Sequence, residues 1–260
     1  MGIAVVIILQ IFRPNAMKHI STFLPLMVSF MMSACLYGGS TELSDELVQQ
    51  HHSLDAFNSI HVKTGVQLIL TQGETYAAMV EADSEVIDRV VLANKDGKLE
   101  IYVENPGGPR WLQWGNNSGT VKVYLSCSEL QALEASSGAH VQTQGLIAAT
   151  SFEMDASSGA HMNVSLNVTE VEVDASSGAH VSLKGQADRI SADASSGAHI
   201  KAADFIALGG VAEASSGAHV TLFVNGSADA KASSGGQVRV LGDVALKSIE
   251  SSSGGSISTR

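Results

Sequence analysis

The sequence Ala-Ser-Ser-Gly-Ala-His occupies residues 135–140 and returns unchanged at 156–161, 175–180, 194–199 and 214–219. Degenerate copies surround Gly235 and Gly254. Successive glycines of this motif are 21, 19, 19, 20, 18 and 19 residues apart. A repeat of nearly twenty residues is typical of a solenoid, in which each repeat forms one coil and stacking buries a shared core.

Apolar and polar residues alternate on both sides of the motif, which indicates β-strands. Around one copy, residues 152–156 precede the Ser-Ser-Gly corner and residues 161–166 follow it. Each repeat therefore predicts two short strands joined by a corner at which glycine permits a tight turn. All four prolines lie at or before Pro109, so none interrupts the later strands. We predict an all-β fold, a parallel β-helix or β-solenoid of about seven coils of 18–21 residues over residues 120–260.

Residues 54–119 show a different pattern, with alternating strand signals at 60–62, 66–70 and 99–103 and a turn signal at 95–97. This predicts an N-terminal β-rich cap. Residues 84–92 fit either a short helix or another strand.

Trp111 and Trp114 lie between two glycine-rich stretches of this region. Two interpretations remain open for them. One is stacking on carbohydrate, and the other is covering the open end of the solenoid core.

The chain begins with features of an export signal over residues 1–34. A basic Lys18 precedes an apolar stretch at 20–32 and small residues at 33–34, which is the pattern of a signal peptide. Met17 is a candidate for the true start, because it places Lys18 in the basic part of the signal.

Residues 32–34, Met-Ser-Ala, stand before Cys35 and resemble the bacterial lipobox, which implies that Cys35 carries a lipid. An ordinary secretory signal, with Cys35 incidental, is the alternative. Residues 35–53, with two adjacent glycines and several acids, predict a flexible tether.

Composition excludes several classes of function. The formal net charge is -11, from 26 acidic and 15 basic residues, which disfavours nucleic acid as a partner. The chain has only two cysteines, so a metal site built from paired cysteines is excluded. No basic residue closely flanks Cys127, and we expect a buried, unreactive thiol there.

The opening at 57–62, the Gly65-Val66 turn and the repeated Ser-Gly-Ala corners resemble the GIN domain family, which is described as putative autotransporter adhesin heads. The resemblance covers residues 54–260. It implies a β-solenoid, an adhesion-type role and export in a Gram-negative bacterium. Because Leu36 rather than Asp follows Cys35, the lipobox resemblance further implies an outer-membrane lipoprotein.

Two columns of side chains follow from the repeat. The residue two after each glycine is a histidine in five successive coils, and these histidines should stack as a ladder: His140, His161, His180, His199 and His219. An acid lies two residues before the first serine of each motif: Glu134, Asp155, Asp174, Asp193 and Glu213. Imidazoles spaced about 4.8 Å apart, with carboxylates nearby, are candidates for binding a divalent metal such as Zn, Cu or Ni. Simple duplication of one surface histidine explains the same pattern without a metal.

A Ser-His-Asp catalytic triad is not indicated, because the same three residue types recur in every coil instead of meeting in one cleft. A polysaccharide-degrading enzyme would need an acidic groove outside the corners, and the sequence shows none clearly.

We therefore expect a non-enzymatic binding or adhesion protein of the cell envelope without a cofactor. Its partners would be the membrane, through a lipid, and a surface glycan or protein. The alternative is a metal-binding protein that uses the histidine ladder.

Overall fold

The computed structural model describes residues 47–104 and 120–260. The signal peptide, Cys35, Trp111 and Trp114 lie outside these residues. Among the residues that the structure describes, no helix is long and apolar enough to cross a membrane.

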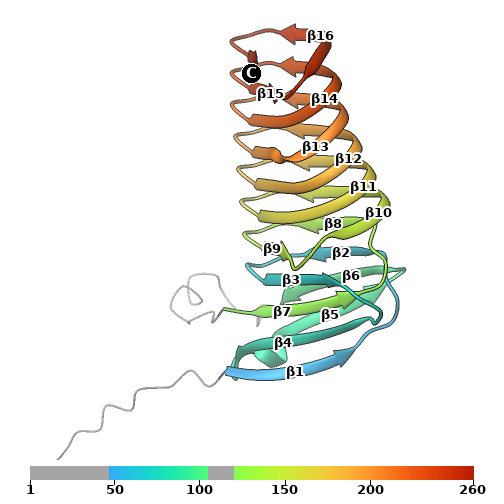
Figure 1. Cartoon of the computed structure of the whole chain (residues 1–260). Coiled ribbons are helices and arrows are strands. Elements are labelled where there is room, and N and C mark those ends of the chain that lie inside the picture. Colours follow the sequence, from blue (N-terminus) through green and yellow to red (C-terminus); the bar gives the residue numbers. More distant parts are fainter. Residues whose placement is uncertain (1–46, 105–119) are drawn as a thin grey trace, which may run out of the picture. The chain divides into compact units, whose positions relative to one another are not determined.

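The residues from 132 onward form a stack of coils, which confirms the predicted β-solenoid of about seven turns (Figure 1). Neighbouring coils pair in parallel and mostly in register, so that Asp155 lies opposite Asp174 and His161 opposite His180. The strands of the stack are β8 (Ala132–Ala135), β9 (His140–Thr143), β10 (Ile147–Ala156), β11 (His161–Ala175), β12 (His180–Ala194), β13 (His199–Ala214), β14 (His219–Ala232), β15 (Gln237–Leu241), β16 (Val244–Ser251) and β17 (Ser256–Thr259).

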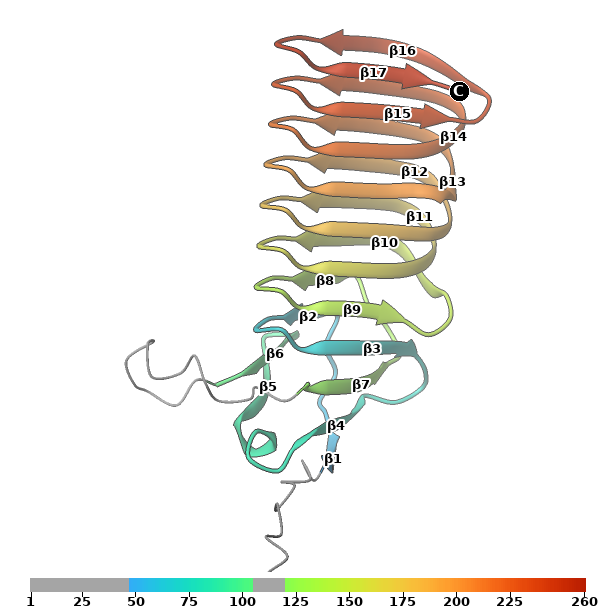
Figure 2. The same ribbon diagram turned by 90° about the vertical axis from the view of Figure 1, so that its left-hand side faces the viewer.

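The middle coils differ from the predicted pair of short strands. Each strand from β11 to β14 begins at a motif histidine, crosses one face, bends, and returns along the other face to the alanine before the next corner. The stacked corners and the stacked bends form the two edges of the stack in Figure 2. Because neighbouring coils bend together, their inter-strand hydrogen bonds continue around the second edge.

Each Ser-Ser-Gly corner is a tight turn with two left-handed residues. In the turn before β12, φ is 51° at Ser177 and 73° at Gly178, and the Ala179 amide donates to the Ser176 carbonyl at 3.0 Å. Two central residues with positive φ are typical of a type I′ turn. The Gly178 amide also donates to the Ser196 carbonyl of the next coil at 3.1 Å, so the corners bond to one another along the stack.

The region before residue 120 contributes more to the stack than predicted. Strands β2 (Ser59–Val62) and β3 (Gln67–Gln72) pair in parallel with β8 and β9 and form an additional coil. Their corner has the same positive φ values, 60° at Thr64 and 67° at Gly65. The sequence Lys63-Thr64-Gly65 lacks the Ser-Ser-Gly motif, so the repeat count does not include it.

The other elements pair as a mostly antiparallel cap, with β1 against β4, β4 against β7, and β5 against β6. They are β1 (Leu47–Ser53), β4 (Ala77–Asp83), η1 (Ile87–Arg89), β5 (Val90–Lys95), β6 (Lys98–Val103) and β7 (Lys122–Cys127). The turn between β5 and β6 has positive φ at Asp96 and Gly97, as the turn signal predicts. Residues 84–92 form a single 3-10 turn followed by a strand. Residues 47–53, predicted as part of the tether, are instead a strand, because β1 completes the cap by pairing with β4.

Mostly aliphatic side chains fill one continuous core through the coils and the cap. The alanines on both sides of each motif corner are buried, for example Ala175 and Ala179, which allows the two faces to approach closely at this edge. Cys127 lies in this core, and burial raises the pKa of its thiol to about 11. The thiolate form is therefore scarce, as expected for an unreactive cysteine.

Candidate functional site

The histidine ladder predicted from the repeat is present on the surface. Successive rings from His140 to His219 have centroids 4.8, 4.9, 4.8 and 4.7 Å apart. The first three pairs are stacked within 17° of parallel, and the last pair is tilted by 33°. The ladder lies where the chain leaves each corner. Its rings align because neighbouring strands pair without a register shift at the histidine.

The acidic column is also in register. Glu134, Asp155, Asp174, Asp193 and Glu213 are successive partners where the chain enters each corner. At the lower end of the stack, Glu134 accepts a hydrogen bond from Lys98 at 2.6 Å and lies 3.2 Å from His61. At the other end, Lys231 lies 3.7 Å from Glu213. Among the described residues, Asp155, Asp174 and Asp193 have no ion pair, so the middle of the column carries uncompensated negative charge.

The ladder and the acidic column lie on opposite faces of the stack. The chain reverses at each corner, and the outward side chains before and after it belong to different sheets. We call the surface after the corners the histidine face and the surface before them the acidic face. In Figure 2 the strands of the histidine face, β3, β9, β15 and β17, lie nearer the viewer.

The pKa shifts agree with this separation. Burial, then the neighbouring His161 and Lys201 side chains, lowers the pKa of His180. Burial, then the charges of Glu172, Asp193, Asp155 and Glu153, raises the pKa of Asp174. Neither group responds to a charge on the opposite face. The expectation that the acids accompany the histidines as close partners is therefore wrong.

The ladder is not arranged as a metal site. Two imidazole nitrogens on one zinc ion each lie about 2.0–2.1 Å from it, and their lone pairs converge on the metal. Rings stacked nearly in parallel with centroids 4.8 Å apart point their nitrogens side by side instead. No group of three or more His, Cys, Asp or Glu side chains suited to a metal occurs within residues 47–104 and 120–260.

Two shallow depressions lie on the histidine face, between the ladder and the next outward column. This adjoining column is also in register, and its members are polar or basic: Gln142, Asn163, Ser182, Lys201, Thr221 and Arg239. One depression of about 230 Å³ lies between His140 and His161 and their neighbours, and a second of about 270 Å³ lies by His199, Lys201 and Arg239.

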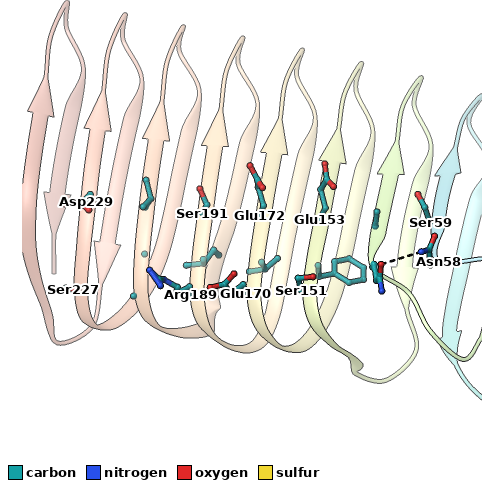
Figure 3. Close-up of a pocket in the computed structure, with 18 of the residues that line it drawn as sticks. Asn58, Ser59, Ser151, Glu153, Glu170, Glu172, Arg189, Ser191, Ser227 and Asp229 are labelled. Carbon is teal, nitrogen blue, oxygen red and sulfur yellow. Dashed lines mark hydrogen bonds between the residues drawn. The ribbon is translucent and has the colours of Figure 1, made fainter. Parts of the chain in front are cut away.

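The acidic face carries a larger groove of about 780 Å³ that crosses several coils (Figure 3). Its carboxylates are Glu153, Glu170, Glu172 and Asp229, and its basic side chains are Arg189 and Lys247. Figure 3 shows Glu153 and Glu172 in one row, with Ser151, Glu170 and Arg189 in a second.

The sequence shows no acidic groove clearly outside the corners, but the structure contains this one. The groove forms at the positions four and six residues before the first motif serine, where residue type changes from coil to coil. No repeated residue type marks these positions in the sequence.

These features define a class of protein, a capped parallel β-solenoid with chemically distinct exposed faces. The chain belongs to the family described as "putative auto-transporter adhesin, head GIN domain", whose model matches residues 56–243. The resemblance stated from the corner motifs is thus confirmed. No curated protein matches the chain.

Several solved structures have a similar fold. A putative adhesin from Bacteroides fragilis has 16% sequence identity and a TM-score of 0.75, over 84% of this chain and 98% of its own. A putative adhesin from Parabacteroides merdae has 14% identity and a TM-score of 0.65, over 84% and 97%. A putative lipid binding protein from Parabacteroides distasonis has 14% identity and a TM-score of 0.63, over 84% and 98%. At these identities the likeness shows the fold, whereas family membership indicates an adhesin-like, non-enzymatic protein of the envelope or surface.

Proposed function

We propose that this protein is a lipid-anchored adhesin-type module of the outer membrane that binds a surface ligand through a repetitive face. The observation that carries the proposal is the histidine ladder, five exposed or half-exposed rings in register on a rigid stack. Such a surface offers the same contacts at every coil, so a repeating ligand gains several weak contacts at once.

Anchoring is proposed from the sequence at Cys35, which lies outside the described residues. Metabolic labelling with a palmitate analogue tests it: the wild-type chain should take up label, and Cys35→Ser should not. Cys127→Ser is the matched control, since the buried thiol should contribute nothing to labelling. Equal labelling of wild type and Cys35→Ser contradicts the anchor.

Binding is tested by applying the full-length chain to an array of purified polysaccharides and extracellular proteins. We expect retention on a subset of surfaces, and loss of it when all five ladder histidines become serine. The control replaces five acids of the other face, with Asp155→Asn, Asp174→Asn, Asp193→Asn, Glu153→Gln and Glu172→Gln. Failure of the wild-type chain to bind any surface contradicts the proposal.

A titration with Zn, Cu and Ni separates adhesion from metal binding. Because the rings do not converge, we expect only the weak affinity of isolated surface histidines. Tight binding that the serine variant loses would favour the metal-binding function instead.

A further inference from the structure

The histidine face and the acidic face differ in charge as well as in residue type. From β8 to β16, the outward columns of the acidic face hold ten carboxylates and three basic residues. On the histidine face, the same coils carry Lys184, Lys201 and Arg239 and one carboxylate, Asp204. A chain with a net charge of -11 thus keeps one face nearly free of acids.

The two faces act as separate electrostatic surfaces. Packed sheets lie about 10 Å apart, and outward side chains add to that distance. Charges separated by more than about 8 Å are largely screened at physiological ionic strength. An anion at the histidine face therefore meets Lys201 and Arg239 directly, while the acids behind the core repel it only weakly.

From this segregation we propose that the histidine face binds an acidic polysaccharide whose chain runs along the stack. The proposal rests on the adhesin function and names its ligand class. Lys201 and Arg239 line one depression together with hydroxyl and amide side chains, which can hydrogen-bond to sugar hydroxyls: Thr221, Gln237, Ser256 and Ser258. Gln142 and Asn163 line the other depression, and Ser182 lies between the two in the same column.

The density of positive charge favours a polysaccharide over a nucleic acid. Nucleic-acid affinity depends on neutralising many phosphates with lysine and arginine, and this face has few such residues. A uronic-acid chain has sparser charge and many hydroxyls, which matches basic groups spaced among polar ones. Protonation at low pH adds positive charge to a histidine side chain. The ladder shares its face with Lys184 on β12, Lys201 on β13 and Arg239 on β15, and with one carboxylate, Asp204.

The test is binding of the full-length chain to immobilised polygalacturonate, with neutral dextran as a reference. We expect binding to polygalacturonate alone, and stronger binding at pH 5.5 than at pH 7.5. The double variant Lys201→Gln/Arg239→Gln should lose about ten-fold in affinity, the sum of two partly exposed charge contacts. Replacing the five ladder histidines with glutamine should remove the pH dependence.

The matched control is Arg189→Gln/Lys231→Gln, which makes the same two replacements on the acidic face. It changes the net charge equally and should leave affinity within about two-fold of wild type. Equal loss in both double variants would mean non-specific attraction and would overturn the proposal. The proposal would also be overturned if the chain bound phosphatidylglycerol vesicles more strongly than polygalacturonate and lost that binding to the same extent in Lys201→Gln/Arg239→Gln. That result would assign the face to anionic lipid.

These outcomes are distinguishable from failure of the adhesin function. If dextran or another neutral polysaccharide binds as well as polygalacturonate, the acidic ligand class is wrong but adhesion stands. If no polysaccharide or protein surface is bound at all, both proposals fail.

Discussion

Two alanine substitutions in one coil should have very different costs. Gly178 lies at the corner before β12 with φ of 73°, and a Cβ added there meets no atom within 4 Å. Gly178→Ala therefore costs only the left-handed conformation, about 1 kcal/mol. Gly185 lies within β12 opposite Leu166 with φ of 113°, and a Cβ there overlaps the Leu166 carbonyl oxygen.

Gly185→Ala can be accommodated only if β11 and β12 separate locally. Losing two inter-strand hydrogen bonds at about 1 kcal/mol each, with backbone strain of about 1 kcal/mol or more, gives a cost of about 3 kcal/mol. For a domain of this size each kcal/mol lowers Tm by about 2–4 °C. We thus expect a loss of about 2–4 °C for Gly178→Ala and about 6–12 °C for Gly185→Ala.

Thermal unfolding followed by far-ultraviolet circular dichroism measures both. Hydrogen exchange should show faster amide exchange in β11 and β12 for Gly185→Ala than for Gly178→Ala. If the two variants unfold at the same temperature, close stacking of the coils at Gly185 is not what limits substitution there, and the reasoning fails.

Three further predictions concern single groups. The pKa values of His180 and His199 are lowered in the folded chain, so the unfolded chain binds more protons than the folded one just below the ordinary pKa of 6.5. The contribution of these two groups to stability is complete above pH 6.5 and is lost as the pH falls from there through their lowered pKa values. The free energy of unfolding from urea titrations should therefore differ less between pH 7.5 and 5.5 in a His180→Gln/His199→Gln variant than in wild type. Since the pKa of Asp174 is raised by burial and neighbouring acids, Asp174→Asn should raise Tm at pH 7 and lose that advantage at pH 3; a lower Tm at pH 7 would show that the carboxylate makes a net favourable contact. Cys127 should resist iodoacetamide at pH 8 in the folded chain and react in urea, which mass spectrometry detects; rapid modification without urea would contradict its burial.

The sequence predicts the coils well because one motif encodes both the turn and the register. Gly178 and its equivalents accept the left-handed conformation, and the identical spacing aligns the histidines without further information. The coil containing Gly65 was missed because its corner has a different sequence with the same backbone conformation. A turn of this kind requires two positive φ values, not two serines.

The candidate site was less predictable. The short spacing between Asp155 and His161 in the motif suggests that their side chains are close. They instead project from opposite faces of the stack, because the chain reverses at the corner between them. The groove of the acidic face combines Glu170, Arg189 and Gly209 at equivalent positions of successive coils. No periodic signal marks it, since its members have different chemistry.

In each middle coil a single strand contributes to both faces, so one repeat of the sequence encodes one position on each face. Duplicating one such unit adds a histidine to one surface and a carboxylate to the other in the same event, and it lengthens the core without a new fold. Ligand reach and avidity can therefore evolve by changing the number of coils, while the opposing charge of the two surfaces is preserved at any length.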